Sequence, residues 1–326
     1  MSKKTSLMGL VAAFGVLSLT LTACGGSGTD GSSAKEFDPG NRITMIVPMA
    51  PGGGSDLSGR AIASGLEKVT GKTISVENLQ GGGGAVGYAD FMGKKGDPSY
   101  LLATETAMVN LPLTEDVPFT WKSFTPVMKV GQDSTIMVVP KSSEFTSCKD
   151  VVANAKSSDV KAAVSGGVTG NDAIQFGLIE KDQNVKFQRV PYESGGEAIA
   201  AAMGGHVDVA LTNPNEVIGQ LESGDMKPLC VIAEERYAYD NLKDIPTTVE
   251  EGINVTFSQF RGFIAPGGLS EEAKQYWIDS AKKYAESDEF KEYMTSNYMQ
   301  TDPLFGDEFT SYLEKYEQDL KAGLEK

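Results

Sequence analysis

ITMIVPMAPGGGSDLS, residues 43–58, is the most informative stretch of this sequence. It begins with a short apolar run at Ile43 and residues 45–47, of the kind that a strand forms when both its faces are buried. Prolines and three consecutive glycines follow, and then Ser55 and Asp56 offer N-caps for the helical pattern of residues 57–69. The stretch therefore predicts a strand, a glycine loop and a helix.

A glycine loop of this kind has two interpretations. Its backbone N–H groups, at the positive end of a helix dipole, can bind an anion that glycine allows to approach closely. The alternative is a tight turn without a ligand. A second strand is expected at residues 73–78 and runs into Gln80 and glycines 81–84, before a helix ending near Met92 and a strand at residues 100–104. Neighbouring loops at one sheet edge favour a ligand site.

The second loop also resembles a nucleotide motif. Gly82, Gly84 and Gly87 match G-x-G-x-x-G, and Glu105 lies near the position of a ribose-binding acid. Two observations argue against a dinucleotide: the motif follows the second strand instead of the first, and the chain carries an export signal. Neither glycine loop has the Gly-Lys-Ser/Thr of a P-loop, so we expect no nucleotide and no other cofactor.

The N-terminus has the pattern of an export signal. Lys3 and Lys4 precede an apolar segment, residues 7–21, which is short of the roughly 20 residues that span a bilayer. Residues 21–24, LTAC, resemble a bacterial lipobox, which implies cleavage before Cys24 and lipid on that residue. An uncleaved anchor is the alternative, but the glycines and serines after Cys24 suit a flexible tether. We expect a signal peptide at 1–23, a tether at 24–41 and an extracytoplasmic, membrane-anchored protein.

The charge of the chain excludes one class of partner. Its formal net charge is −15, and removal of Lys3 and Lys4 with the signal makes it more negative still. No basic stripe offsets this charge, so nucleic acid is not expected as a partner. An anionic small ligand remains compatible, because net charge is screened over about 8 Å whereas the amides of a pocket act at contact.

The remaining cysteines and the single histidine limit the chemistry further. Outside the cytoplasm Cys148 and Cys230 could form a disulfide, but their positions at a helix start and in an apolar strand favour two buried free thiols. His206 is the only histidine and no Cys-x-x-Cys occurs, so no metal site is expected. We interpret His206 as structural, because any serine–histidine–acid triad would need it and no Gly-x-Ser-x-Gly accompanies it.

The second half of the chain repeats the alternation of strand, small-residue loop and helix. Strands are expected at residues 134–140, 160–164, 187–190, 207–211 and 229–233. One helix is expected at 146–155, and another follows the turn at 165–172 and runs through 180. Residues 192–197 open a helix that ends near 203, a further helix starts at 216, and a short one is expected at 247–251. Residues 257–266 read as an extended crossing, followed by helices at 273–286, from 287, and at 307–324. This pattern predicts a second α/β lobe, after which the chain crosses back to the lobe formed by the first half of the sequence.

Four motifs resemble one known family. Residues 43–56 (ITMIVPMAPGGGSD), 76–84 (VENLQGGGG), 190–209 (VPYESGGEAIAAAMGGHVDV) and 261–266 (RGFIAP) look like the substrate-binding proteins of tripartite tricarboxylate transporters, the TctC or Bug receptors. The resemblance runs from about Ile43 to the end. It implies an α/β, two-lobed periplasmic-binding-protein-like (type II) fold with two crossing hinge strands, near residues 138–141 and 261–264. Lobe 1 would comprise residues 42–139 plus 263–326, and lobe 2 residues 140–262.

The resemblance also implies a ligand site. Two loops of lobe 1 would hold one ligand carboxylate through amides and hydroxyls, which needs no cationic side chain. The residues implied are Ala50, Gly52, Gly53, Ser55, Gly82 and Gly83 in lobe 1, and Ser165, Gly166, Thr169, Asn171, Ser194, Gly195, Gly196 and Asn213 in lobe 2. A histidine that the family often shows near the third loop is absent, since Gly170-Asn171-Asp172 stands there.

Three charged residues near this site need separate interpretations. Asp56 should stabilise its helix and not face a ligand carboxylate. Arg261 could clamp a second carboxylate or form a salt bridge across the hinge. Arg60 is expected to be solvated or paired with an acid.

The leading hypothesis is a monomeric, lipid-anchored receptor that delivers a small di- or tricarboxylate, citrate-like as a first guess, to the permease subunits of a tripartite tricarboxylate transporter. We do not expect an enzyme. The alternatives are an extracytoplasmic carboxylate-processing enzyme and a ligand-presenting sensor for a membrane kinase.

Overall fold

The computed structural model describes residues 37–166 and 170–325. The expected signal peptide, the lipidation residue Cys24 and the site residue Thr169 lie outside the described residues. No helix among the described residues is both long and apolar enough to cross a bilayer.

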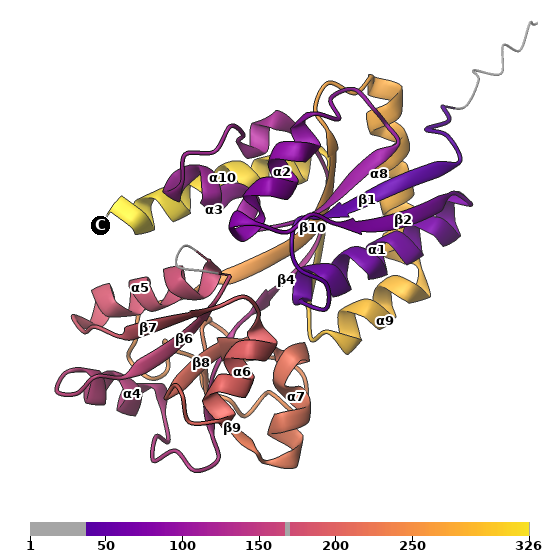
Figure 1. Ribbon diagram of the computed structural model, residues 1–326. Helices are drawn as coiled ribbons and strands as arrows, with labels where there is room; N and C mark the ends of the chain where they lie inside the picture. The colour runs from indigo at the N-terminus through magenta and orange to yellow at the C-terminus, as the bar shows by residue number, and fades with distance from the viewer. Residues whose placement is uncertain (1–36, 167–169, 326) are drawn as a thin grey trace, which may run out of the picture. The chain divides into compact units, whose positions relative to one another are not determined.

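Two sheets organise the described chain, each in its own lobe. Lobe 1 contains a six-stranded sheet with the order β11-β4-β10-β3-β1-β2 (Figure 1). Its strands are β1 (Arg42–Val47), β2 (Thr73–Asn78), β3 (Tyr100–Glu105), β4 (Phe124–Ser134), β10 (Ser258–Pro266) and β11 (Gln300–Phe305). β1 pairs in parallel with β2 and β3, whereas β10 runs antiparallel to both β3 and β4. The predicted first strand is confirmed, and Met45, Ile46 and Val47 in it are fully buried.

Lobe 2 contains a five-stranded sheet with the order β7-β6-β8-β5-β9. Its strands are β5 (Ile136–Pro140), β6 (Lys161–Ser165), β7 (Gln188–Tyr192), β8 (Val209–Thr212) and β9 (Met226–Val231). β6 is parallel to both of its neighbours, and β5 is antiparallel to β8 and β9.

Helices cover both faces of the lobe 1 sheet. α1 (Gly54–Thr70), α8 (Glu271–Glu286) and α9 (Asp288–Ser296) pack on one face around Trp277 and Tyr284. The other face carries α2 (Ala85–Met92), α3 (Ala107–Thr114) and α10 (Asp307–Glu325). Gly65 of α1 is required by this packing, because a Cβ there would overlap the Tyr284 ring. Two short 3-10 turns complete the lobe, η1 (Gly82–Gly84) and η2 (Trp121–Ser123).

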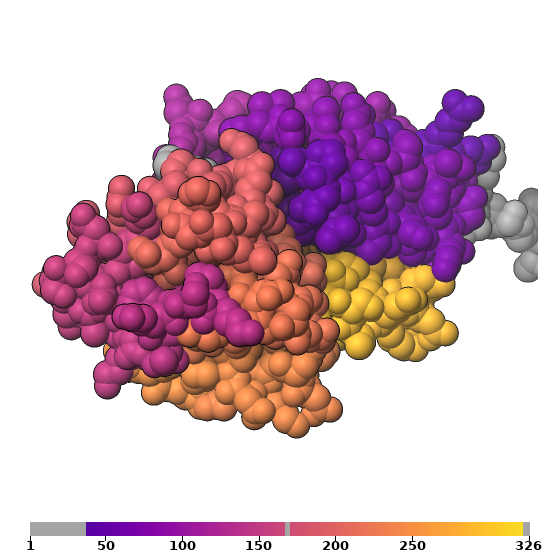
Figure 2. Space-filling model, turned by 60° about the horizontal axis from the view of Figure 1, so that its bottom comes forward, coloured from indigo at the N-terminus to yellow at the C-terminus, as the bar shows by residue number. Residues whose placement is uncertain are grey.

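Lobe 2 is also layered on both faces. Its helices are α4 (Cys148–Ala155), α5 (Asn171–Gln183), α6 (Gly195–Met203) and α7 (Pro214–Ser223). α4 and α5 pack on one face, and α6 and α7 on the other. In the space-filling view, the segments that precede and follow lobe 2 in the chain (purple and yellow) lie side by side. The middle part of the chain, which forms lobe 2, packs next to them (Figure 2).

The chain crosses between the lobes twice. β4 ends at Ser134 and β5 begins at Ile136, so Thr135 alone separates strands of the two sheets. The return crossing comes directly before Ser258, the first residue of β10. The hinges expected at residues 138–141 and 261–264 lie inside β5 and β10, a few residues beyond the points at which the chain changes sheet. The lobe boundaries at 139/140 and 262/263 remain predictions.

Several elements differ from the expectation. Residues 247–251 form turns and not a helix: Thr247 and Glu250 cap each other, and the turn ends at Gly252, whose φ of 80° is left-handed. α3, β4 as a long strand and β11 were not predicted. α3 contains Pro112, and β11 reads QTDPLF, so neither has the regular pattern of its class.

Cys148 and Cys230 form a disulfide, which corrects the expectation of free thiols. Their Cα atoms lie 5.9 Å apart, and both side chains are fully buried. The burial was predicted, but the pairing depends on α4 beginning directly over β9 on one face of the lobe 2 sheet. Local sequence patterns do not specify that contact.

Replacing both cysteines with alanine should lower the free energy of unfolding by about 2–5 kcal/mol, because the bridge closes a long loop in the unfolded chain. Denaturant unfolding of a soluble form that begins after Cys24 measures the change. Wild type treated with a reductant should match the double variant, and the double variant should not respond to reductant. Two reactive thiols in the untreated, denatured wild type would contradict the bridge.

Candidate functional site

A cavity of about 140 Å³ lies between the two lobes. It is lined by residues that follow the carboxyl ends of β1, β2, β3, β6, β7 and β8, and by β10. This is the edge at which ligands bind in open α/β sheets. The structure brings most of the predicted site residues to it, namely Ala50, Gly53, Ser55, Gly83, Ser165, Gly166, Asn171, Ser194, Gly195, Asn213 and Arg261.

Three of the described residues that were predicted for the site do not line the cavity. Gly52, Gly82 and Gly196 belong to the same loops but are not among its lining residues. Thr169 lies outside the described residues.

The β1–α1 loop presents a helix N-terminus to the cavity. The N-cap of α1 is Gly53, which has no side chain to bond to the first-turn N–H groups. An ideal Cβ at Gly53 would meet only Ala50 O at 3.8 Å, so the space beside this backbone is open. The loop therefore has the geometry of an anion site at a helix N-terminus.

Asp56 stabilises this loop from outside the cavity. Its Oδ2 accepts hydrogen bonds from Gly52 N at 2.9 Å and from Arg60 Nε at 3.0 Å, and its Oδ1 accepts from Asn78 Nδ2 at 2.9 Å. Burial opposes the charge, but these bonds outweigh it and lower the pKa of Asp56. Asp56 is thus satisfied by the protein, and Arg60 is paired with an acid.

Arg261 lies at the base of the cavity in a buried cluster of charges. Its Nη1 donates to Glu105 Oε2 at 2.5 Å, and its Nη2 lies 3.4 Å from Asp133 Oδ2. Ser55 Oγ donates to the same Glu105 oxygen at 2.8 Å. Burial opposes the charge of Arg261, but Asp133 and Glu105 outweigh it and raise its pKa. Arg261 thus forms salt bridges, but to two strands of its own sheet and not across the hinge; its role as a clamp for a second ligand carboxylate stays a prediction.

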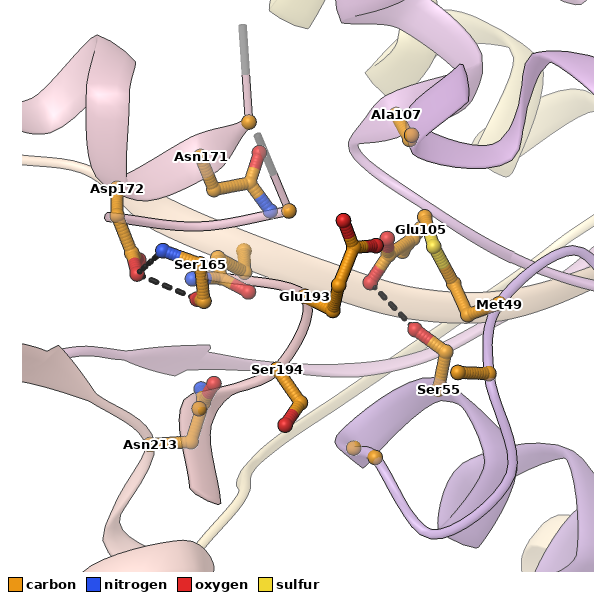
Figure 3. A pocket seen from close by; sticks show the side chains of 18 of the residues that line it. Met49, Ser55, Glu105, Ala107, Ser165, Asn171, Asp172, Glu193, Ser194 and Asn213 are labelled. Atoms are coloured by element: carbon orange, nitrogen blue, oxygen red, sulfur yellow. Dashed lines mark hydrogen bonds between the residues drawn. The ribbon is translucent and has the colours of Figure 1, made fainter. Parts of the chain in front are cut away.

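Asp172 and Ser165 form a hydrogen-bonded pair on the lobe 2 side (Figure 3). Asp172 Oδ2 accepts from Ser165 N at 2.9 Å and from Ser165 Oγ at 2.5 Å. Burial raises the pKa of Asp172 to about 7, against the effect of these bonds. The pair joins the end of β6 to the first turn of α5 at the cavity wall.

Polar contacts connect lobe 2 to lobe 1 beside the cavity. Asn171 Oδ1, at the start of α5, accepts from Thr106 Oγ1 at 2.7 Å and from Asn110 Nδ2 at 2.8 Å. Asn213 Nδ2 donates to Asp133 Oδ2 at 2.8 Å, and Asp133 belongs to β4. These contacts join the two walls of the cavity.

Sequence reasoning missed several lining residues, most of them acidic: Glu105, Asp172, Glu193, Glu216, Asn110 and Gln259. Each lies on a loop, strand or helix start that was already identified. A systematic search for acidic residues within eight positions after each predicted strand end would have found the acids. Glu105 was noted, but only in connection with the dinucleotide motif. His206 is exposed and is not among the lining residues.

Replacing Arg261 with methionine should lower the free energy of unfolding by about 3–5 kcal/mol, because it leaves two buried carboxylates without a cation. Arg236→Met is the matched control, since Arg236 forms an exposed pair with Glu250 and its loss should change stability far less. Denaturant unfolding at neutral pH measures both changes. Equal losses would contradict the cluster.

The raised pKa of Asp172 makes a prediction about pH. The folded state holds this proton up to about pH 7, whereas the unfolded state releases it near 3.8. Stability from this group is therefore present below pH 3.8 and is lost as the pH rises to about 7.

Wild type should accordingly lose stability relative to Asp172→Asn as the pH rises between these values, as measured by denaturant unfolding. Asp150→Asn is the control, because hydrogen bonds from Thr146 lower the pKa of Asp150 and reverse the sign. A difference between wild type and Asp172→Asn that does not change with pH would contradict the assignment.

Comparisons with known proteins place this geometry in a family. Residues 59–316 match the family model described as "Tripartite tricarboxylate transporter family receptor". The protein BugT of Bordetella pertussis is 27% identical over 220 residues, which cover 66% of this chain and 67% of BugT.

Two solved structures share the fold. MatC from Rhodopseudomonas palustris, with bound malate, has a TM-score of 0.76 at 19% identity. The match covers 86% of this chain and 98% of MatC. Rpa4515 of R. palustris, with adipate, has a TM-score of 0.80 at 19% identity. The match covers 87% of this chain and 96% of Rpa4515. These likenesses confirm the two-lobed α/β fold, and the family match confirms the resemblance seen in the sequence. This chain belongs to the tripartite tricarboxylate transporter receptor family.

Proposed function

We propose that this protein is a lipid-anchored, extracytoplasmic receptor that captures a small carboxylate and delivers it to the permease subunits of a tripartite tricarboxylate transporter. The observation that carries the proposal is the uncapped N-terminus of α1 at the cavity, with Gly53 as its N-cap. Such a terminus binds a carboxylate through backbone N–H groups and the helix dipole. Family membership supports an extracytoplasmic solute receptor.

The size of the cavity supports a small ligand. Its volume of about 140 Å³ is below the range of roughly 300–1,000 Å³ that holds drug-sized molecules. MatC and Rpa4515 were solved with malate and adipate, which are small dicarboxylates. Citrate, the first guess from the sequence, belongs to the same chemical class and is included in the test below.

The anchor and the oligomeric state rest on the sequence. The lipobox at residues 21–24 supports lipidation of Cys24, and the tether at 24–41 would give the receptor reach from the membrane. We propose a monomer that acts with its permease.

The alternative functions have less support. An enzyme would need a base beside a nucleophile, and the Ser165–Asp172 pair at the cavity lacks a histidine because His206 is exposed elsewhere. A sensor that presents its ligand to a membrane kinase uses the same cavity. Recovery of a kinase, and not a permease, with the anchored protein would identify a sensor.

The Gly53→Val variant tests the carboxylate site. Its side chain would fill the space beside the α1 N-terminus, and the backbone φ of −81° accepts valine. We expect ligand-induced stabilisation in wild type, about 2.7 kcal/mol at 100 times the Kd, and none in the variant. Thermal unfolding against citrate, malate, succinate, adipate, amino acids and neutral sugars measures it.

The matched control is Gly219→Val, at an exposed position of α7 with nothing within 4 Å of its Cβ. It should bind like wild type. Retained binding by a folded Gly53→Val variant would refute the α1 site, and stabilisation by sugars alone would refute carboxylate binding.

A further inference from the structure

Acidic side chains outnumber basic ones in the lining of the cavity. Glu105, Asp172, Glu193 and Glu216 contribute carboxylates, and Arg261 is the only cationic side chain among the described lining residues. A site for a ligand with two or three carboxylates would need the opposite balance, since like charges in a confined site repel.

Arg261 does not supply a spare positive charge. It is 5% exposed and is already paired with Glu105 and Asp133. Recruiting it for a second ligand carboxylate would leave one of these buried acids without its partner, which is costly. Arg261 is the one cation in this cluster and is shared by two acids, so it leaves no spare positive charge for the remaining acids of the cavity.

The two lobes treat their helix N-termini differently. In lobe 1 the first-turn acid of α1, Asp56, points away from the cavity and is bonded to Gly52, Arg60 and Asn78. In lobe 2 the first-turn acids of α5 and α7, Asp172 and Glu216, line the cavity. Lobe 1 therefore offers the positive N-terminus of α1 to an anion, whereas lobe 2 places a carboxylate at the N-termini of α5 and α7.

Of the lobe 2 acids, Glu216 is held at the cavity by its neighbours, whereas Glu193 is exposed at the cavity. Glu216 Oε2 accepts from Thr212 Oγ1 at 3.2 Å and fills the space that a Cβ at position 195 would occupy, so Gly195 makes room for it. Glu193 precedes the N-cap of α6, and its side chain extends into the pocket (Figure 3).

A neutral residue gives an independent indication. Asn110 lines the cavity, is 2% exposed, and donates through Nδ2 to Asn171 Oδ1. Its own Oδ1 is buried and accepts no hydrogen bond in the described structure. A buried acceptor without a donor is costly. A ligand that donates a hydrogen bond to Asn110 Oδ1 in the cavity would remove this cost. Acids in a first helical turn are common, but this acceptor and Glu193 lie outside that pattern.

We propose that the ligand carries a cationic group, such as an ammonium, together with the carboxylate that lobe 1 holds. The α1 N-terminus binds the carboxylate, and Glu193, Glu216 and Asn110 face the cation. The substrate class is thus ammonium-bearing carboxylates, in preference to citrate-like polycarboxylates. This inference rests on the proposed function, because it assigns the second half of the same site.

Matched pairs of probes test the charge preference. Calorimetric titration would compare 4-aminobutyrate with succinate, 5-aminopentanoate with glutarate, and alanine with lactate, with citrate added. Within the pairs that bind, the ammonium-bearing member should bind at least about tenfold more tightly, as expected for a hydrogen bond between charged groups. Tighter binding of the dicarboxylates or citrate, or equal binding, would overturn the inference and leave the proposed receptor function standing.

Charge-removing variants locate the cation. Glu216→Gln and Glu193→Gln should each weaken binding of the ammonium probe by about tenfold or more, without weakening succinate. Glu222→Gln is the control, since Glu222 is exposed on the same helix as Glu216 and does not line the cavity. Unchanged affinity for the ammonium probe in both variants would overturn the assignment. Failure of every probe in both series would count against the proposed function itself.

Discussion

The buried guanidinium of Arg261 connects the parts of the structure that form the cavity. Arg261 lies on β10, Glu105 ends β3 and Asp133 lies near the end of β4, so one side chain joins three neighbouring strands. Asn213 extends the network into lobe 2 through Asp133. Removing Arg261 leaves two buried carboxylates without a cation, so both acids depend on this one side chain. The base of the cavity is therefore set by the same contacts that hold the crossing strands together.

Around this base, the two walls of the cavity are built from the same strand–loop–helix unit but differ in where their acidic side chains lie. Every wall loop follows a strand and begins a helix, which directs helix N-termini toward the cavity. In lobe 1 the loop backbone is left open beside Gly53, Asp56 points away from the cavity, and Glu105 is paired with Arg261. In lobe 2 the corresponding acids remain at the wall. A common fold can thus supply a positive and a negative surface that face each other, through the placement of a few carboxylates.

The fold and the main loops were predictable because their signals are local. The apolar run before the glycines gave β1, and repeated loops gave the other strands that end at the cavity. What could not be predicted depends on contacts between distant segments. Glu105 acquires its role only when β10 brings Arg261 beside it, and Cys148 meets Cys230 only because α4 packs over β9. Asn110 lies on α3, a helix that contains Pro112 and shows no clear pattern.

The position of β10 in its sheet also constrains how the chain can fold. β10 lies between β3 and β4, so the central strand of lobe 1 is supplied by residues 258–266. Lobe 2, by contrast, is built from one continuous segment that precedes it in the chain. During synthesis and export, lobe 2 can complete its sheet while β3 and β4 still lack the strand that joins them. We expect lobe 1 to assemble last, with exposed strand edges that are vulnerable to aggregation until the C-terminal segment arrives.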